Sequence, residues 1–296
     1  MMQKFSMGMQ RKVVILFILA WACAILAGCS AGRLAYGNGE SLSYWWVDSY
    51  IDLDAQQGAA AKASIASLFE WHRRTQLPEY VQWLGMIEKR LQGPATAEYI
   101  DADVAGLKQR LRRMTERAAP ALADLAMALQ PAQIDRLRSK LASGNEAYRG
   151  EHVEGDVVER QDRRFRKVLK QAEYWFGDFT DAQEAQIRAA SDARPLDPER
   201  VYADRLQRQQ ALIAMLHKIR IDKLTREAAA GLIKAALDPE RQHEGPADAQ
   251  AFFDAVQVAN DRLMLVILNS TTTAQRAKAA TLVRRWMHDL KALSRT

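Results

Sequence analysis

Cys29 is the residue whose type and position most directly suggest chemistry. It follows a basic N-terminal segment and an apolar stretch from Val13 to Ala27. A basic segment, about fifteen apolar residues and a junction of small residues are typical of a secretory signal peptide. The stretch is shorter than the roughly 20 apolar residues that a membrane-spanning helix needs. The Cys29 thiol is a nucleophile that directly follows two small residues, Ala27 and Gly28, which let the backbone enter a processing site.

The run Leu26-Ala27-Gly28-Cys29 resembles the lipobox of bacterial lipoproteins. The resemblance implies that residues 1–28 are a signal peptide that is removed. It also implies lipidation of Cys29 with a diacylglyceryl group and fatty acyl chains such as palmitate. Two or three acyl chains hold a protein on a bilayer far longer than one chain does. By resemblance to Gram-negative lipoproteins, Ser30 rather than Asp after the cysteine favours the outer membrane. We therefore expect a lipid-anchored protein that faces the periplasm.

Removal of the signal peptide changes the charge and the cysteine content. The full chain has a net charge of +6, and the loss of Lys4, Arg11 and Lys12 lowers it to +3. This modest charge argues against a nucleic-acid partner. Cys23 leaves with the signal peptide and Cys29 carries lipid, so no disulfide is expected in the body. Stability must then come from a packed apolar core.

Helical periodicity dominates from Ser41 onward, and strand alternation is almost absent. Four predicted helix starts share a pattern in which a polar residue precedes a glutamine by three positions. In three of the four the polar residue is Asp or Thr, which is typical of the capping box at a helix N-terminus. The four pairs are Asp54 and Gln57, Gln130 and Gln133, Thr180 and Gln183, and Thr272 and Gln275.

The breaks between helices predict an all-α protein, an irregular multi-helix bundle of long amphipathic helices. Residues 29–40, which contain several glycines, are expected to be the lipidated N-terminus and its tether. The clearest break is Arg194-Pro195-Leu196-Asp197-Pro198. We therefore predict two packed helical subdomains, one over residues 41–193 and the other over residues 194–296.

Two family resemblances support this fold and location. The cap-and-glutamine pattern is similar to the Leu-Thr-x-x-Gln signature of small periplasmic envelope-stress proteins of the Spy/CpxP type, which limit aggregation of unfolded envelope proteins. Phe179-Thr180-x-x-Gln183 is the copy nearest to it. More of the chain resembles an uncharacterised family of proteobacterial helical lipoproteins. That resemblance rests on the lipobox, an aromatic stretch before Leu53-Asp54, Trp71-His72-Arg73, Leu77-Pro78-x-Tyr80 and Thr180-x-x-Gln183.

The aromatic cluster Tyr44-Trp45-Trp46 begins the folded body and has two interpretations. Such a cluster more often belongs to the core, and we expect that here. The alternative is a belt that touches the membrane surface near the anchor, where Trp and Tyr are enriched.

The densest run of cations is a candidate contact for an anionic partner. Its members are Arg160, Arg163, Arg164, Arg166, Lys167 and Lys170. A solvated helix face explains most of such a run, and Glu159 supports Arg163 at the i, i+4 spacing. The functional alternative is binding to anionic lipid, lipopolysaccharide phosphates or an acidic segment of a client protein.

Catalytic and metal-binding patterns are not found in the sequence. The five histidines form no i, i+4 ligand pair and no HExxH motif, so no metal is expected. Asp48, Asp52 and Asp54 are better explained by helix capping than by a carboxylate site. His72, within Trp71-His72-Arg73-Arg74, is the one residue whose role in substrate contact is worth testing. We predict a protein that is not an enzyme and needs no cofactor.

The expected function is therefore binding. We expect an outer-membrane-anchored periplasmic lipoprotein whose partner is another envelope protein, toward which it acts like a chaperone. The alternative is a structural or assembly lipoprotein that contacts an outer-membrane machine, lipopolysaccharide or peptidoglycan.

Overall fold

The computed structural model describes residues 31–241 and 246–295, most of which are helical, and no strand occurs within these ranges. The prediction of an all-α, multi-helix protein is confirmed. The elements are α2 (Ala31–Gly37), α3 (Gly39–Ile51), α4 (Ala55–Trp71), the π-helical segment η1 (His72–Gln76), α5 (Leu77–Arg90), α6 (Ala97–Ala128), α7 (Pro131–His152), α8 (Val157–Phe176), α9 (Asp181–Asp192), α10 (Pro198–Ile221), α11 (Arg226–Ala236), α12 (Ala247–Ser270) and α13 (Thr273–Leu293).

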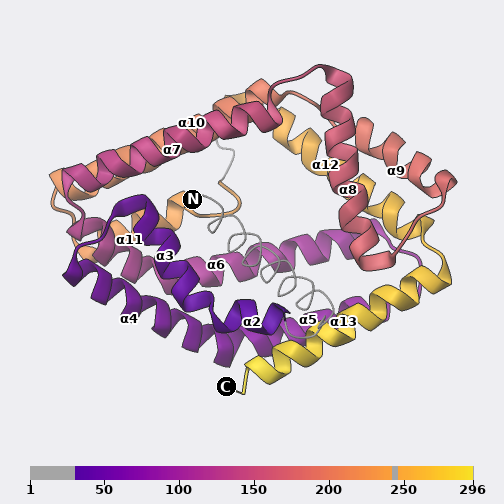
Figure 1. The fold of residues 1–296 in the computed structure, drawn as a ribbon, viewed down its shortest axis with the longest axis horizontal. Helices are drawn as coiled ribbons and strands as arrows, with labels where there is room; N and C mark the ends of the chain where they lie inside the picture. The colour runs from indigo at the N-terminus through magenta and orange to yellow at the C-terminus, as the bar shows by residue number, and fades with distance from the viewer. Residues whose placement is uncertain (1–30, 242–245, 296) are drawn as a thin grey trace, which may run out of the picture.

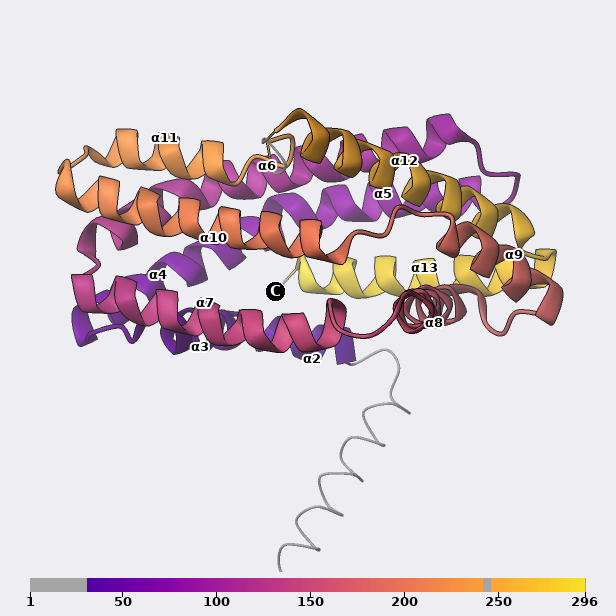
Figure 2. The same ribbon diagram turned by 90° about the horizontal axis from the view of Figure 1, so that it is seen from above.

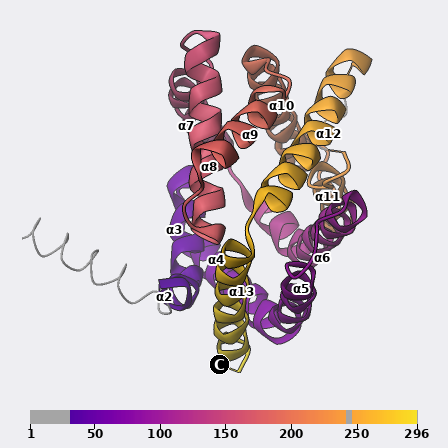
Figure 3. The same ribbon diagram turned by 90° about the vertical axis from the view of Figure 1, so that its right-hand side faces the viewer.

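The helices form an elongated frame rather than a bundle around one axis (Figure 1). Helices α7 and α10 lie side by side along one long side, and α13 packs on α5 along another. Helices α8, α9 and α12 form one end. Seen from above and from the end, α2, α3, α7 and α8 lie on one side, and α5, α6, α11 and α12 lie on the opposite side (Figures 2 and 3).

The four predicted capping motifs each stand at a helix start, at α4, α7, α9 and α13. At α4, Asp54 Oδ1 accepts the N–H of Gln57 at 2.8 Å, and Gln57 Oε1 accepts the N–H of Asp54 at 3.1 Å. Thr180 and Thr272 make the same exchange with their glutamines. Each motif thus satisfies backbone N–H groups that a helix leaves free at its start.

The capping glutamines also bind one another, which the sequence did not reveal. In the first glutamine pair, Gln57 Nε2 donates to Gln133 Oε1 at 3.0 Å, and Gln133 Nε2 donates to Gln57 Oε1 at 2.6 Å. Each Nε2 donates in addition to a main-chain carbonyl before the other cap, Ala128 O at 2.8 Å or Asp52 O at 2.9 Å. Both side-chain amides therefore use two donor and two acceptor positions.

The second glutamine pair repeats these contacts. Gln183 Nε2 donates to Gln275 Oε1 at 2.9 Å, and Gln275 Nε2 donates to Gln183 Oε1 at 3.4 Å. The corresponding carbonyls are Ser270 O and Asp178 O, each at 2.7 Å. In both pairs the accepting carbonyl belongs to the residue two positions before the partner's N-cap. The molecule therefore contains two helical units built on the same junction.

The helices around each pair correspond as well. In the first unit α3 packs on α4 and α7, and α4 packs on α6; in the second unit α8 packs on α9 and α13, and α9 packs on α12. The remaining helices that lie between the motifs of one unit, α5 in the first and α10 and α11 in the second, pack on helices of the other unit. Helix α5, which lies between the motifs of the first unit, packs on α13 of the second. Helices α10 and α11, which lie between the motifs of the second unit, pack on α6 and α7 of the first.

This exchange determines where the cores lie. One core cluster combines residues of α6 and α7 with residues of α10 and α11, among them Ile134 and Ile219, which are fully buried. The other combines α8 and α9 with α12 and α13, around Phe176 and Ile187. Both clusters draw on residues before and after position 194. The cores therefore do not follow the expected division into residues 41–193 and 194–296.

Tertiary packing determines the local structure of residues 31–37 and of the helix around Pro120. Residues 31–37, within the expected tether, form helix α2, which packs on α3 and α13. Pro120 lies inside the single helix α6. A proline costs a helix one hydrogen bond and a steric contact. Neighbouring Ala119 and Ala123 are fully buried against α10 and α11, and this tertiary packing keeps the helix continuous.

Candidate functional site

The predicted basic run lies on α8, and much of it binds the protein's own backbone. Arg160 donates to the carbonyls of Val153 at 3.0 Å and Asp156 at 3.2 Å, and Arg163 donates to Glu154 O at 2.5 Å. These bonds close the turn between α7 and α8. That turn contains Gly155, whose φ of +96° suits glycine. The two arginines therefore fix the start of α8.

Arg164 extends the same role to the linker after α9. Its guanidinium donates to Arg194 O at 3.4 Å and Pro195 O at 3.3 Å, and it is half-buried. Burial lowers the pKa of Arg164. The pKa of Arg194 falls to about 10, because burial and the nearby cation of Arg164 both disfavour its charged form. The linker predicted from its prolines is therefore held by α8.

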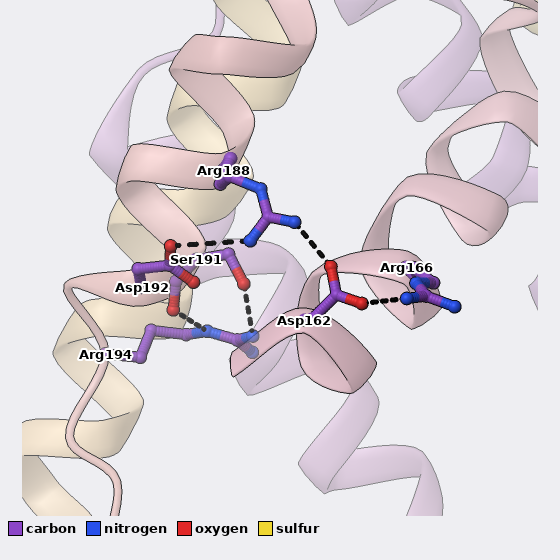
Figure 4. Close-up of polar contacts among 6 residues, drawn as sticks. All are labelled: Asp162, Arg166, Arg188, Ser191, Asp192 and Arg194. Atoms are coloured by element: carbon purple, nitrogen blue, oxygen red, sulfur yellow. Dashed lines mark hydrogen bonds and ion pairs between the residues drawn. The ribbon is translucent and has the colours of Figure 1, made fainter. Parts of the chain in front are cut away.

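Asp162 lies at the centre of the ion pairs that join α8 to α9 (Figure 4). It binds Arg188 at 2.5 Å and also pairs with Arg166 one turn along α8. Hydrogen bonds from Arg188 and Arg166 lower the pKa of Asp162. Nearby, Arg194 donates to Ser191 O at 3.1 Å and Ser191 Oγ at 2.9 Å. Within the run, Asp162 thus compensates the charge of Arg166, whereas the bonds to carbonyls occupy N–H donors of Arg160, Arg163 and Arg164.

Lys167 and Lys170 differ from the four arginines of the run. Both are exposed and, within the described part of the chain, neither makes an ion pair or a side-chain hydrogen bond. They lie three residues apart, and hence on one face of α8. The sequence grouped six cations by proximity. Hydrogen bonds to backbone carbonyls or an ion pair with Asp162 distinguish the four arginines from these two lysines.

His72 lies at the start of η1 between two tyrosines. Its Nδ1 is 2.8 Å from Tyr36 Oη of α2, and its Nε2 is 3.3 Å from Tyr80 Oη of α5. Burial lowers the pKa of His72 and raises the pKa values of Tyr36 and Tyr80. A neutral ring between two neutral phenols is the arrangement that these shifts favour. Both ring nitrogens are engaged within the protein, so His72 links α2, η1 and α5.

A salt bridge accompanies this cluster. Arg73 Nη2 is 2.9 Å from Glu40 Oε1 at the start of α3. Gly39 packs against the ring of Phe69, so closely that a Cβ at this position would lie 2.6 Å from a ring carbon. Together these contacts hold α2 and the start of α3 against α4 and η1.

The aromatic cluster of α3 is not a core cluster, and for Trp45 and Trp46 that prediction is wrong. Trp45 is 66% exposed and Trp46 is 58% exposed, whereas Tyr44 is half-buried beside Gly58. The core that α3 contributes comes from Tyr50 and Ile51. The three adjacent aromatic residues therefore divide between two faces of one helix, as the 100° step of a helix requires.

The remaining sequence candidates have simple places in the structure. Asp54 is the N-cap of α4, as predicted, and Asp48 Oδ1 accepts the N–H of Leu53 at 3.0 Å. No group of three or more His, Cys, Asp and Glu residues in ranges 31–241 and 246–295 is placed to hold a metal ion. Among the same residues, no helix combines the length and apolar character of a membrane span. Cys29 lies outside the described residues.

The described residues form two interleaved helical units, each closed by a pair of capping glutamines. Residues 49–233 match a family of unknown function (DUF6279), and because the match covers more than half of the chain, the chain belongs to this family. The matched part contains Gln57, Gln133 and Gln183 and ends before α12. Comparison with curated proteins and with solved structures found no significant match.

Proposed function

We propose that the protein is an outer-membrane-anchored, periplasm-facing lipoprotein that binds other envelope proteins and limits their aggregation. The anchor is assigned to Cys29 from the resemblance of Leu26-Ala27-Gly28-Cys29 to a lipobox. The binding role rests on the form of the helical body and on the apolar side chains that it leaves in contact with water.

The open form gives the protein an unusually large surface. The chain exposes 19047 Å², whereas a compact monomer of 33.4 kDa exposes about 12,600 Å². Residues 1–30 account for at most about 4,800 Å² if they are counted as a fully exposed chain. The remaining surface still exceeds that of a compact protein. Such a surface suits binding to extended partners.

An exposed apolar stripe on α6 is the observation that carries the proposal. Leu107, Leu111 and Leu122 are 47%, 46% and 38% exposed. Their spacing places them along one face of the helix. Contiguous exposed apolar surface marks interaction sites more often than single exposed residues do. Met86 and Met127 are also exposed, and flexible methionine side chains adapt to varied partners.

An aggregation assay tests this binding role. Purified protein should slow the aggregation of unfolded test proteins at stoichiometric ratios. The double variant Leu107→Ser/Leu111→Ser should lose most of this effect. Val258→Ser is the matched control, because Val258 is 69% exposed on α12 and outside the stripe. Equal activity of both variants, or no activity of the unaltered protein, would reject the chaperone-like role.

Two further measurements address the anchor and the alternative function. Mass spectrometry should find an acylated N-terminal Cys29, and Cys29→Ser should release the protein from the membrane fraction. A photo-crosslinker at Leu111 distinguishes a client binder from an assembly lipoprotein. Many weak crosslinks support the first, whereas one dominant crosslink, to an outer-membrane protein or the cell wall, supports the second.

A further inference from the structure

We infer that the outer face of α2 and α3 docks on the lipid bilayer and sets the orientation of the helical body. This inference rests on the proposed lipid anchor. The face consists of Leu34, Leu42, Trp45 and Trp46, which are 59%, 55%, 66% and 58% exposed. These four residues are called the α2–α3 face below.

The four side chains belong to one surface because α2 and α3 are almost continuous. Leu34 O accepts the N–H of Asn38 at 3.1 Å, and Asn38 O accepts the N–H of Leu42 at 3.0 Å. Helical i to i+4 bonding thus crosses the junction. At 100° per residue, the four positions fall within about a third of the helix circumference. Figure 3 shows α2 and α3 at an edge of the molecule.

Charge is nearly absent from this face. Among the exposed residues between positions 32 and 46, Arg33 is the one charged residue, although charged residues make up 26% of the chain. The acidic residues of α3 are used elsewhere. Glu40 binds Arg73, and Asp48 accepts the N–H of Leu53. The face therefore presents four large apolar side chains, the uncharged Asn38 and Ser41, and one cation beside it. Such a surface suits a lipid headgroup region, and tryptophan is enriched at that depth.

The position of the face in the chain points to the same occupant. Leu34 is five residues after Cys29, so its Cα lies within about 18 Å of the acylated cysteine even if the chain between them is fully extended. A lipidated Cys29 therefore brings α2 to the headgroup layer. The proposed anchor is therefore sufficient to bring this face to the bilayer, and no partner protein is needed.

The body is fixed to the docking face rather than joined to it by a flexible link. Tyr36 of α2 bonds to His72 at 2.8 Å and packs on Phe69, with 5.4 Å between the ring centroids. The Arg73–Glu40 salt bridge ties the start of α3 to η1. His72 is thus a positioning residue for the docking face. Docking of the face fixes which side of the frame points into the periplasm.

Quenching of tryptophan fluorescence by brominated phospholipid tests the inference. Protein purified from membranes after expression of the full chain is reconstituted into phosphatidylethanolamine–phosphatidylglycerol vesicles with bromine in the acyl chains. Fluorescence should be quenched relative to unbrominated vesicles. Trp45→Phe/Trp46→Phe should abolish most of the quenching. Trp286→Phe is the control, since Trp286 is 39% exposed on α13 beside Tyr174 of α8 and should leave quenching unchanged.

Three outcomes would overturn the inference. The first is unquenched fluorescence in vesicle-bound protein, and the second is equal quenching in both variants. The third is a change from dimer to monomer in Trp45→Phe/Trp46→Phe, measured by sedimentation, without a change in quenching, since a second copy would then cover the face. Failure of the proposed function is seen separately, as an unmodified Cys29 or an inactive aggregation assay.

Discussion

In the first glutamine pair the side-chain amides exchange hydrogen bonds of 3.0 and 2.6 Å, whereas in the second pair the distances are 2.9 and 3.4 Å. The residue before the N-cap also differs. It is the buried Leu129 at the start of α7 but the buried Thr271 at the start of α13. The same short motif thus forms two junctions of unequal quality, because its surroundings come from different helices.

The comparison predicts the largest loss of stability at the first pair. Gln57→Ala removes the side-chain bond to the N–H of Asp54 and the bonds to Gln133 and Ala128, and it leaves the amide of Gln133 without this partner. The free energy of unfolding should fall by about 2–4 kcal/mol, since each net hydrogen bond contributes about 1 kcal/mol and a buried unpaired group costs about 1–3 kcal/mol. Urea denaturation followed by circular dichroism measures the change. The neighbouring exposed Gln56→Ala should have little effect.

A smaller loss is expected at the second pair, because its 3.4 Å bond is weak. Gln183→Ala should lower the free energy of unfolding by about 1–3 kcal/mol, less than Gln57→Ala does. The exposed Gln186 on the same helix supplies the control substitution. An equal or larger loss at Gln183 would show that the distances do not rank the two junctions.

Double-mutant cycles measure the coupling within and between the pairs. Gln57→Ala combined with Gln133→Ala should cost less than the sum of the single changes, by about 1–2 kcal/mol. Gln57→Ala combined with Gln183→Ala should be additive within about 0.5 kcal/mol, because these residues share no partner. Strong coupling between Gln57 and Gln183 would contradict two separate junctions.

One substitution should strengthen the first pair. Gln130 is the N-cap of α7, and glutamine is not among the residues preferred there. Gln130→Thr reproduces the caps of α9 and α13. We expect a gain of about 0.5–1 kcal/mol in the free energy of unfolding. Thr180→Gln, the reverse change, should lower the free energy of unfolding by a similar amount. A change of the same sign in both variants would contradict this explanation.

The smallest predicted effect is a pH dependence of stability that arises from His72 in the first unit. Burial lowers the folded-state pKa of His72 below its usual value of 6.5. The unfolded chain therefore binds more protons between the lowered pKa and 6.5. The contribution of His72 to stability is complete above pH 6.5 and is lost as the pH falls through this window. His72→Gln should flatten the fall in melting temperature between pH 7 and pH 5, whereas the exposed His288→Gln should not.

The sequence identified the features that depend on neighbouring residues. The helix starts at Asp54, Thr180 and Thr272 follow from capping, which involves residues three positions apart. The linker at residues 194–198 follows from its prolines. The all-helical class follows from apolar periodicity. Each of these depends on backbone rules that act within one or two helical turns.

These rules could not predict contacts between residues that are far apart in the sequence. Gln57 and Gln133 are 76 residues apart, and Gln183 and Gln275 are 92 residues apart. Nothing in a single sequence indicates which motif pairs with which. The Pro-rich linker was taken as a domain boundary, yet α10 and α11 return to α6 and α7 and complete their core. A proline-rich linker shows that the chain changes direction, but it does not show that the following helices belong to a different core.

The exposed tryptophans were missed for a different reason. Trp45 and Trp46 were assigned to the core by their residue type. A count of charge along the same helices would have been more informative, because the exposed residues from position 34 to position 46 carry no charge. The internal contacts of the basic run were missed because the backbone carbonyls that bind Arg160, Arg163 and Arg164 cannot be identified from a sequence.

Because α5, α10 and α11 pack on the opposite unit, proteolysis of the chain should not separate the two units. A protease that cleaves the linker between Pro195 and Pro198 would produce two fragments, but α10 and α11 would stay packed on α6 and α7, and α5 on α13. The two pieces should remain one particle until a denaturant separates them. The same exchange makes fragment complementation feasible, with residues 29–195 and 196–296 reassembling when they are expressed as separate chains.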